Sequence, residues 1–289
     1  MTELKFPALY NDADVASGNA QREYLRLVIL EYLLLFIAAV LTIQTFDETP
    51  FIILYALVFI VSMITMLIRT LQKPDQDWYK CRALAESIKT STWRYAMRAE
   101  PFDDAKAQDA RTDFRNMLKA IFNSNQHIGN RISGLRADGK QITEEMDELR
   151  NKNLDERKNI YLEDRIRDQR EWYKKKAKFN KKAMNIWIFV CIFVYVSATS
   201  LVLLRIKFPD NFVPTEPIIV IASSIVGWMQ IKKFSELSSS YSLTAHEIGI
   251  IEDRANDADT NEEFSVFVNE AELAFSREHT QWVARQLQA

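Results

Sequence analysis

The chain has 289 residues, of which 48% are hydrophobic, and its formal net charge is -2 at pH 7. Taken as averages, these values describe an ordinary soluble protein of one or two domains. The distribution excludes that interpretation, because the apolar residues are concentrated in two pairs of blocks while most charged residues lie between and around them. The near-neutral total therefore says nothing about partners, and the local charge becomes the informative quantity.

The first two apolar blocks cover residues 27–46 and 51–71, and only the stretch from Asp47 to Pro50 separates them. Each is close to the roughly 20 residues that a helix rising about 1.5 Å per residue needs to cross the hydrocarbon core of a bilayer. Two such helices with so short a connection predict a membrane hairpin.

A second hairpin is predicted by the apolar blocks 184–204 and 217–231. The fourth block is short for a span, although Lys232 and Lys233 can extend it by directing their charged ends to the membrane surface. A buried core helix is the alternative interpretation of any single block. The pairing of the blocks favours four transmembrane helices and an all-α membrane protein.

Cations predict the orientation of both hairpins. Lys and Arg flank each span at the end that is away from the hairpin turn. They are Arg22, Arg26, Arg69, Lys73, Lys174, Lys175, Lys176, Lys178, Lys181, Lys182, Lys232 and Lys233. Cytoplasmic flanks of spans are enriched in these residues. Both termini and the long middle region are therefore expected in the cytoplasm.

The middle region carries helical apolar spacing. One face is formed by Trp78, Cys81, Ala85, Ile88, Thr92 and Tyr95, and another by Ala107, Ala110, Phe114, Met117 and Ile121. Three glycines, Gly129, Gly134 and Gly139, then predict a turn region. From Gln141 to the third span neither Gly nor Pro occurs, which leaves two interpretations: one long stalk helix, or a break near residues 151–153.

The carboxyl-terminal part repeats this organisation. Apolar residues from Leu237 to Ala255 keep a heptad-like spacing, and Thr260 with Glu263 forms a capping box that predicts the start of a last helix. Each half thus reads as a hairpin with cytoplasmic helices, which indicates an internal duplication with units at residues 1–140 and 141–289. The narrow apolar stripes favour coiled-coil packing within or between chains.

Motifs for catalysis are missing from the sequence. It contains no phosphate-binding loop, dinucleotide fingerprint, nucleophile elbow or zinc-protease motif. Cys81 and Cys191 are too few for a disulfide framework and are expected to be buried apolar residues, and the histidines are scattered singly. We therefore expect no enzyme, no catalytic residue, no metal and no cofactor.

Polar residues inside the spans are costly and are candidates for packing or a pore. Glu31 lies about one turn into the first span, near enough to the cytoplasmic edge to reach the headgroups or to pair with Arg22 or Arg26, and an interfacial ion pair is favoured over a pore role. The other candidates are small or uncharged: Gln44, Ser197, Ser200, Ser223 and Gly227. The four-residue spacing of Ser223 and Gly227 permits close approach of two helices.

Two motifs resemble a known superfamily. Directly after the first hairpin come Trp78, Tyr79, Lys80, Cys81, Arg82, Ala83, Leu84, Ala85, Glu86, Ser87, Ile88 and Lys89, then Thr92, Trp93, Arg94, Tyr95, Pro101 and Phe102. This run is similar to the SLATT superfamily, the SMODS- and SLOG-associating two-transmembrane effector domains of prokaryotes. Glu272, Ser276, Arg277, Glu278, His279 and Trp282 resemble the ending of the same superfamily. The two hairpins in tandem depart from its simplest form.

The resemblance implies a membrane effector of prokaryotic conflict, or anti-phage, systems in the bacterial inner membrane. It would form a homo-oligomer and open a pore or disrupt the bilayer after a trigger. The trigger would be a nucleotide second messenger or a sensor protein encoded nearby, without direct binding of nucleic acid. The residues expected to sense it are Arg82, Glu86, Lys89, Trp93 and Arg94, for which a buried ion-pair and aromatic seam is the alternative. The competing functions are a membrane-anchored scaffold and a constitutive ion channel.

Overall fold

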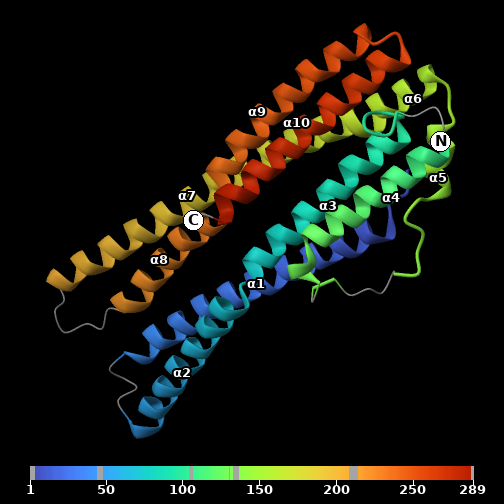
Figure 1. Ribbon diagram of the computed structural model, residues 1–289. Coiled ribbons are helices and arrows are strands. Elements are labelled where there is room, and N and C mark those ends of the chain that lie inside the picture. The colour runs from blue at the N-terminus through green and yellow to red at the C-terminus, as the bar shows by residue number, and fades with distance from the viewer. Residues whose placement is uncertain are drawn as a thin grey trace. The chain divides into compact units, whose positions relative to one another are not determined.

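A computed structural model describes residues 4–43, 48–103, 107–129, 131–132, 137–207 and 214–287, and their regular structure is entirely helical (Figure 1). The fold class is therefore all-α, as predicted. The chain forms two compact units. One, which we call the span unit, consists of Glu23–Lys73 and Lys174–Ser242. The other, the bundle unit, consists of Met1–Arg22, Pro74–Tyr173 and Leu243–Ala289.

Four helices are long and apolar enough to cross a membrane, and their apolar parts lie in the span unit. They are α1 (Ala8–Leu41), α2 (Thr49–Gln72), α7 (Asp168–Lys207) and α8 (Thr215–Lys232). The predicted spans coincide with them, apart from residues 44–46, which lie outside the described part. Large apolar side chains such as Leu57, Phe193 and Ile219 are exposed on these helices. That exposure is favourable in lipid and costly in water.

The two helices of the first hairpin pack together through a small buried cluster. Leu34 and Ala38 of α1 and Val58 of α2 form a small buried cluster, with Leu41 and Tyr55 against it. Pro50 lies in the first turn of α2, where its missing N–H and fixed φ cost nothing. The helix ends at Lys73 in the left-handed conformation, and this residue's N–H donates to the Arg69 carbonyl.

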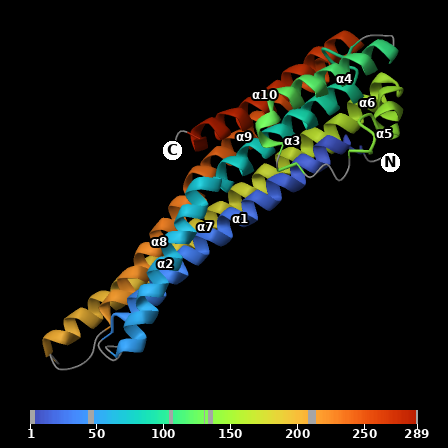
Figure 2. The same cartoon turned by 60° about the horizontal axis from the view of Figure 1, so that its bottom comes forward.

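Helix α3 (Pro74–Ala96) contacts α4 (Ala107–Ser124), α5 (Glu144–Arg150) and α10 (Asn261–Leu287) in the bundle unit. Both views show α3 running beside α4 (Figure 2). Its predicted apolar face is buried at Cys81, Ala85, Ile88, Thr92 and Tyr95. Residues Ala110 and Phe114 of α4 and Met146 of α5 complete this core. The helical apolar spacing of these two segments therefore predicted a real core face.

The charged stretch after the turn region contains the break that was one of the two sequence interpretations. Helix α5 ends at Arg150, and α6 (Leu154–Tyr161) begins after Asn153, whose side-chain oxygen accepts from the Glu156 N–H at 2.9 Å. A π-helical segment, η3 (Leu162–Arg167), then connects α6 to α7. Single π turns inside helices concentrate at functional sites, because they re-aim side chains.

The carboxyl-terminal helices are α9 (Phe234–Arg254) and α10, with the short 3₁₀ helix η4 (Ala255–Asp257) between them. The predicted capping box is confirmed. The Glu263 N–H donates to the Thr260 hydroxyl oxygen at 3.2 Å, and the Thr260 N–H donates to the Glu263 carboxylate at 3.0 Å. Residues Phe264, Val268, Ala271 and Phe275 of α10 are buried. The side chain of Trp282 lies outside the described part.

Candidate functional site

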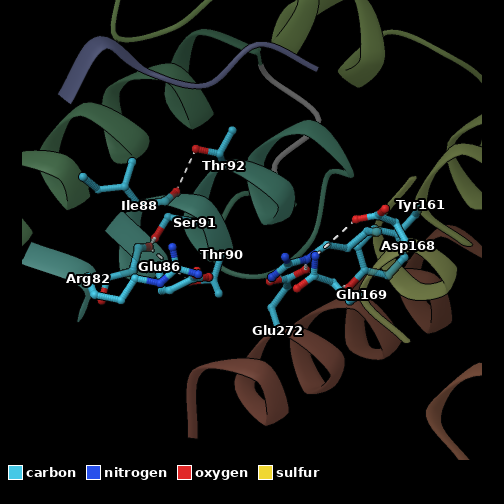
Figure 3. Close-up of polar contacts among 12 residues, drawn as sticks. Arg82, Glu86, Ile88, Thr90, Ser91, Thr92, Tyr161, Asp168, Gln169 and Glu272 are labelled. Atoms are coloured by element: carbon cyan, nitrogen blue, oxygen red, sulfur yellow. Dashed lines mark hydrogen bonds and ion pairs between the residues drawn. The ribbon is translucent and has the colours of Figure 1, made fainter. Parts of the chain in front are cut away.

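A polar cluster lies buried inside the bundle unit, and we call Trp93, Arg94, Tyr161, Arg165 and Glu272 the buried polar cluster. Three parts of the chain supply it: Trp93 and Arg94 come from α3, Tyr161 and Arg165 from α6 and η3, and Glu272 from α10. Figure 3 shows Tyr161 and Glu272 facing each other. Buried charges are rare unless they are paired, so their geometry carries information.

Glu272 and Arg165 form a two-pronged ion pair. Arg165 Nε donates to Glu272 Oε1 at 2.8 Å and Arg165 Nη2 donates to Oε2 at 2.7 Å. The Tyr161 hydroxyl donates to Oε1 at 3.0 Å. The side chains of Arg165 and Glu272 are 1% and 0% exposed. Parallel bonds from one guanidinium to one carboxylate are among the strongest polar contacts in proteins.

The local sequence explains why these groups are excluded from water. Tyr161 and Arg165 are four residues apart and therefore lie on one side of the helix formed by α6 and η3. Glu272 is flanked on α10 by the buried residues Ala271 and Phe275. The Arg165 guanidinium lies 4.6 Å from the centroid of the Phe275 ring, a cation–π distance. The buried apolar face of α10 thus includes the carboxylate of Glu272, which contacts Arg165.

Burial and the carboxylate of Glu272 shift the titration of its neighbours. Burial raises the pKa of Tyr161 well above its usual value, and the charge of Glu272 raises it further. Burial alone would lower the pKa of Arg165, but the charge and hydrogen bonds of Glu272 together raise it. Burial lowers the pKa of Arg94, partly opposed by Glu272 and Tyr161. At neutral pH Tyr161 is therefore neutral and can donate its hydroxyl hydrogen to Glu272.

Three buried donors in the cluster have no hydrogen-bond partner among the described residues. They are Trp93 Nε1, Arg94 Nε and Arg165 Nη1. An unsatisfied buried donor costs about 1–3 kcal/mol, and more when it is charged. The cluster therefore combines a strong ion pair with uncompensated polar groups. Such a combination is typical of sites that rearrange or bind a further polar group.

The sequence predicted Arg82, Glu86, Lys89, Trp93 and Arg94 as sensing residues, and the structure places all five on α3. The first four repeat at four-, three- and four-residue spacing, so they lie on one face. Arg82 pairs with Glu86 at 2.7 Å and with Asp14 of α1 at 3.3 Å.

This face of α3 is connected to the buried polar cluster. The Trp93 ring packs edge-to-face on the Tyr161 ring, with 5.7 Å between centroids. Burial lowers the pKa of Lys89, and so does the charge of Arg165, whereas Glu86 and Glu272 oppose the shift. These contacts form an ion-pair and aromatic seam, and a sensing role for the five residues stays a prediction.

Two further buried arginines, which the sequence did not single out, hold the carboxyl end of α3. Arg150 Nη1 donates to the Tyr95 carbonyl at 2.7 Å, and Arg157 Nη1 donates to the Met97 carbonyl. Cations at this end are favoured, because the last carbonyls of a helix carry partial negative charge. Burial lowers the pKa of Arg157 to about 10, and nearby Arg98 and Arg150 add to this shift.

The missed residues had a recognisable spacing. Arg157, Tyr161 and Arg165 repeat every four residues, and all three are nearly or fully buried. The surrounding stretch is rich in Lys, Asp and Glu, which are typical of a solvated helix face, so these three were not distinguished from their neighbours. A four-residue repeat of Arg and Tyr inside a charged segment was the available signal.

The predicted span residues differ in their surroundings. Glu31 does form an ion pair, but its partner is Arg69 of α2 at 2.9 Å; the prediction of Arg22 or Arg26 was wrong. The sequence could not indicate this, because the two residues meet only when α1 and α2 pair. Gln44 lies outside the described residues.

The small polar residues of the second hairpin separate into two groups. The Ser200 hydroxyl donates to the Val196 carbonyl of its own helix at 2.9 Å, while Ser197 is half-buried and Ser223 is exposed. Gly227 of α8 lies against the Tyr32 hydroxyl of α1, so a Cβ there would overlap it. Of the predicted pair, Gly227 thus makes a close approach and Ser223 does not. Their roles in a pore stay predictions.

The four apolar helices and the helical bundle define a helical membrane protein with two hairpins in tandem. A sequence model of the SMODS and SLOG-associating 2TM effector domain 3 matches residues 7–158, and one of the SMODS and SLOG-associating 2TM effector domain 1 matches residues 161–282. The chain therefore belongs to the SLATT family of membrane effector domains. No curated protein and no solved structure matches it.

Proposed function

We propose that this protein is an effector of a prokaryotic anti-phage system that oligomerises and permeabilises the inner membrane after a trigger. The observation that carries the proposal is the match of two consecutive two-transmembrane effector domains to one chain whose four apolar helices fit the length of a bilayer. A pore assembled from subunits needs no charged residue at the bilayer midplane, unlike most coupled transporters.

The buried polar cluster supplies a physical means of holding such an effector inactive. Helix α3 follows α2 after Lys73 alone, and η3 continues directly into α7. Inside one unit, Trp93 of α3 packs on Tyr161, and Arg165 of η3 pairs with Glu272. Tyr161 also donates a hydrogen bond to Glu272. The ion pair thus fastens η3, which continues into the apolar span of α7, to α10. Helix α3, which follows the apolar helix α2, joins the same cluster through the contact of Trp93 with Tyr161. Opening the cluster would loosen both α3 and η3.

The trigger we propose is an anionic signal or a protein partner that competes for these groups. Lys89, Arg94 and Arg165 place three cations against the two carboxylates of Glu86 and Glu272. The unsatisfied donors of Trp93, Arg94 and Arg165 favour an additional acceptor. A phosphate-bearing nucleotide supplies both negative charge and acceptor oxygens.

The test is membrane potential and dye influx in bacteria that express the full chain from a tightly controlled promoter, with its genomic neighbours and with or without phage. We expect depolarisation only after infection for the wild type. Glu272→Gln, which breaks the ion pair, is expected to depolarise cells without infection. Glu270→Gln is the matched control on the same helix, since it removes only the half-exposed pair with Arg254. Membrane levels of each variant are followed by immunoblot.

Membranes that stay intact under every triggering condition, for wild type and Glu272→Gln alike, would contradict the proposal. If partner proteins were still recruited to the membrane in those cells, the chain would act as a scaffold instead.

A further inference from the structure

An apolar groove of about 390 Å³ lies in the span unit between three of its helices. Helix α1 lines it with Ile29, Tyr32, Leu33 and Phe36, helix α7 with Trp187, and helix α8 with Ile221, Ser224, Ile225 and Trp228. The volume falls within the range of about 300–1,000 Å³ that is typical of pockets for small molecules. Because all three helices are candidate spans, the medium that meets this groove is the bilayer itself.

Cations gather where the apolar parts of these helices end. Arg26 precedes the groove residues of α1, Lys182 precedes Trp187, and Lys232 follows Trp228. Lys232 Nζ lies 5.3 Å from the centroid of the Trp228 ring, so one cation lies directly on a wall of the groove. Among the residues that the structure describes, no carboxylate forms an ion pair with Lys232. Glu31, which is next in sequence to the groove residue Tyr32, is paired with Arg69.

The groove is lined almost entirely by apolar side chains from three helices of the same unit. A flexible hydrocarbon chain fits a narrow apolar groove, and aromatic rings such as Trp187 and Trp228 are typical of the level where acyl chains meet headgroups.

We infer that this groove binds one acyl chain of an anionic glycerophospholipid, with the headgroup phosphate on Lys232. The apolar walls supply the hydrophobic contact, and Lys232 supplies preference for negative charge. A lysine near a membrane surface contributes an attraction that corresponds to about a fivefold difference in affinity for an anionic lipid. This inference concerns lipid binding alone and does not depend on pore formation.

Native mass spectrometry of the full-length protein, delipidated in detergent and titrated with phosphatidylglycerol or phosphatidylethanolamine, tests the inference. We expect one tightly held phosphatidylglycerol per chain for the wild type. Ser224→Trp fills the groove and is expected to bind this lipid at least about tenfold more weakly. Ser223→Trp adds the same ring at the adjacent exposed position, outside the groove, and is expected to bind like the wild type.

Lys232→Ala leaves the groove walls in place and tests the headgroup contact separately from any folding defect. It is expected to weaken phosphatidylglycerol about fivefold and to leave phosphatidylethanolamine unchanged. Equal lipid occupancy in the wild type, Ser224→Trp and Lys232→Ala would overturn the inference. A dimer that binds no tight lipid and dissociates in Ser224→Trp would also overturn it, because a second copy of the chain would then cover the groove.

Discussion

Removing the charge of Glu272 should strongly destabilise the bundle unit. In Glu272→Gln the side chain keeps its shape, but the guanidinium of Arg165, which is 1% exposed, loses its only buried carboxylate partner among the described residues. Breaking a buried pair in this way costs about 3–5 kcal/mol, because an uncompensated charge stays out of water. In a unit of this size, about 2–4 °C of melting temperature corresponds to each kcal/mol, which gives a fall of about 6–20 °C.

The assay is thermal unfolding of the full chain in detergent, followed by circular dichroism. Glu270→Gln serves as the control, because its pair with Arg254 is about half exposed and is worth only about 0–1 kcal/mol. The double variant Arg165→Met/Glu272→Met removes both charges and is expected to recover part of the loss. If Glu272→Gln melted within about 2 °C of Glu270→Gln, the ion pair would not hold the bundle together, and the reasoning would be refuted.

Three further predictions concern other parts of the chain. Gly227→Ala should destabilise the span unit by about 1–3 kcal/mol, because its Cβ meets the Tyr32 hydroxyl, while Gly249→Ala, where a Cβ meets nothing, should be neutral or stabilising in the same melting assay. Thr260→Ala should cost about 0.5–2 kcal/mol in the same melts by removing the α10 cap. Cys81, whose pKa burial raises from 9.0 to about 11, should contribute stability at pH 8 that is lost as pH rises through that window.

A different result would contradict each of these three predictions. Gly227→Ala that melts like Gly249→Ala would mean that α1 and α8 do not meet at this glycine. An unchanged melting temperature in Thr260→Ala would show that the capping bonds are not needed. The stability that Cys81 contributes falls as pH rises from 9 to 11, because the folded state holds the thiol proton more tightly than the unfolded state. In Cys81→Ala, stability should therefore fall less steeply with pH over that range. If it fell as steeply as in the wild type, the fall would not come from Cys81.

The sequence predicted those parts of the fold that depend on local chemistry. Apolar length and periodicity predicted the four apolar helices and the core face of α3, and Thr260 with Glu263 predicted a helix start, because each depends on neighbouring residues. The break near residues 151–153 was one of two interpretations, and the structure contains it.

The sequence did not predict how distant segments pair. Glu31 was assigned to a nearby arginine, whereas its partner Arg69 lies on the next helix. Tyr161 and Arg165 meet Glu272 across more than 100 residues of chain. Charged residues lie on a solvated face in most helices, and only tertiary packing determines which few are buried. A single sequence contains no signal for such pairings.

The separation of the ion pair has a consequence for biosynthesis. Arg165 and Glu272 are 107 residues apart in the chain. At about 5–20 residues per second, a ribosome needs about 5–20 seconds to make the partner of Arg165 after Arg165 itself. During that interval α7 and α8 are synthesised while α10 does not yet exist. A nascent chain stalled or truncated before α10 would therefore carry all four apolar helices while Arg165 and Tyr161 still lack the carboxylate of Glu272.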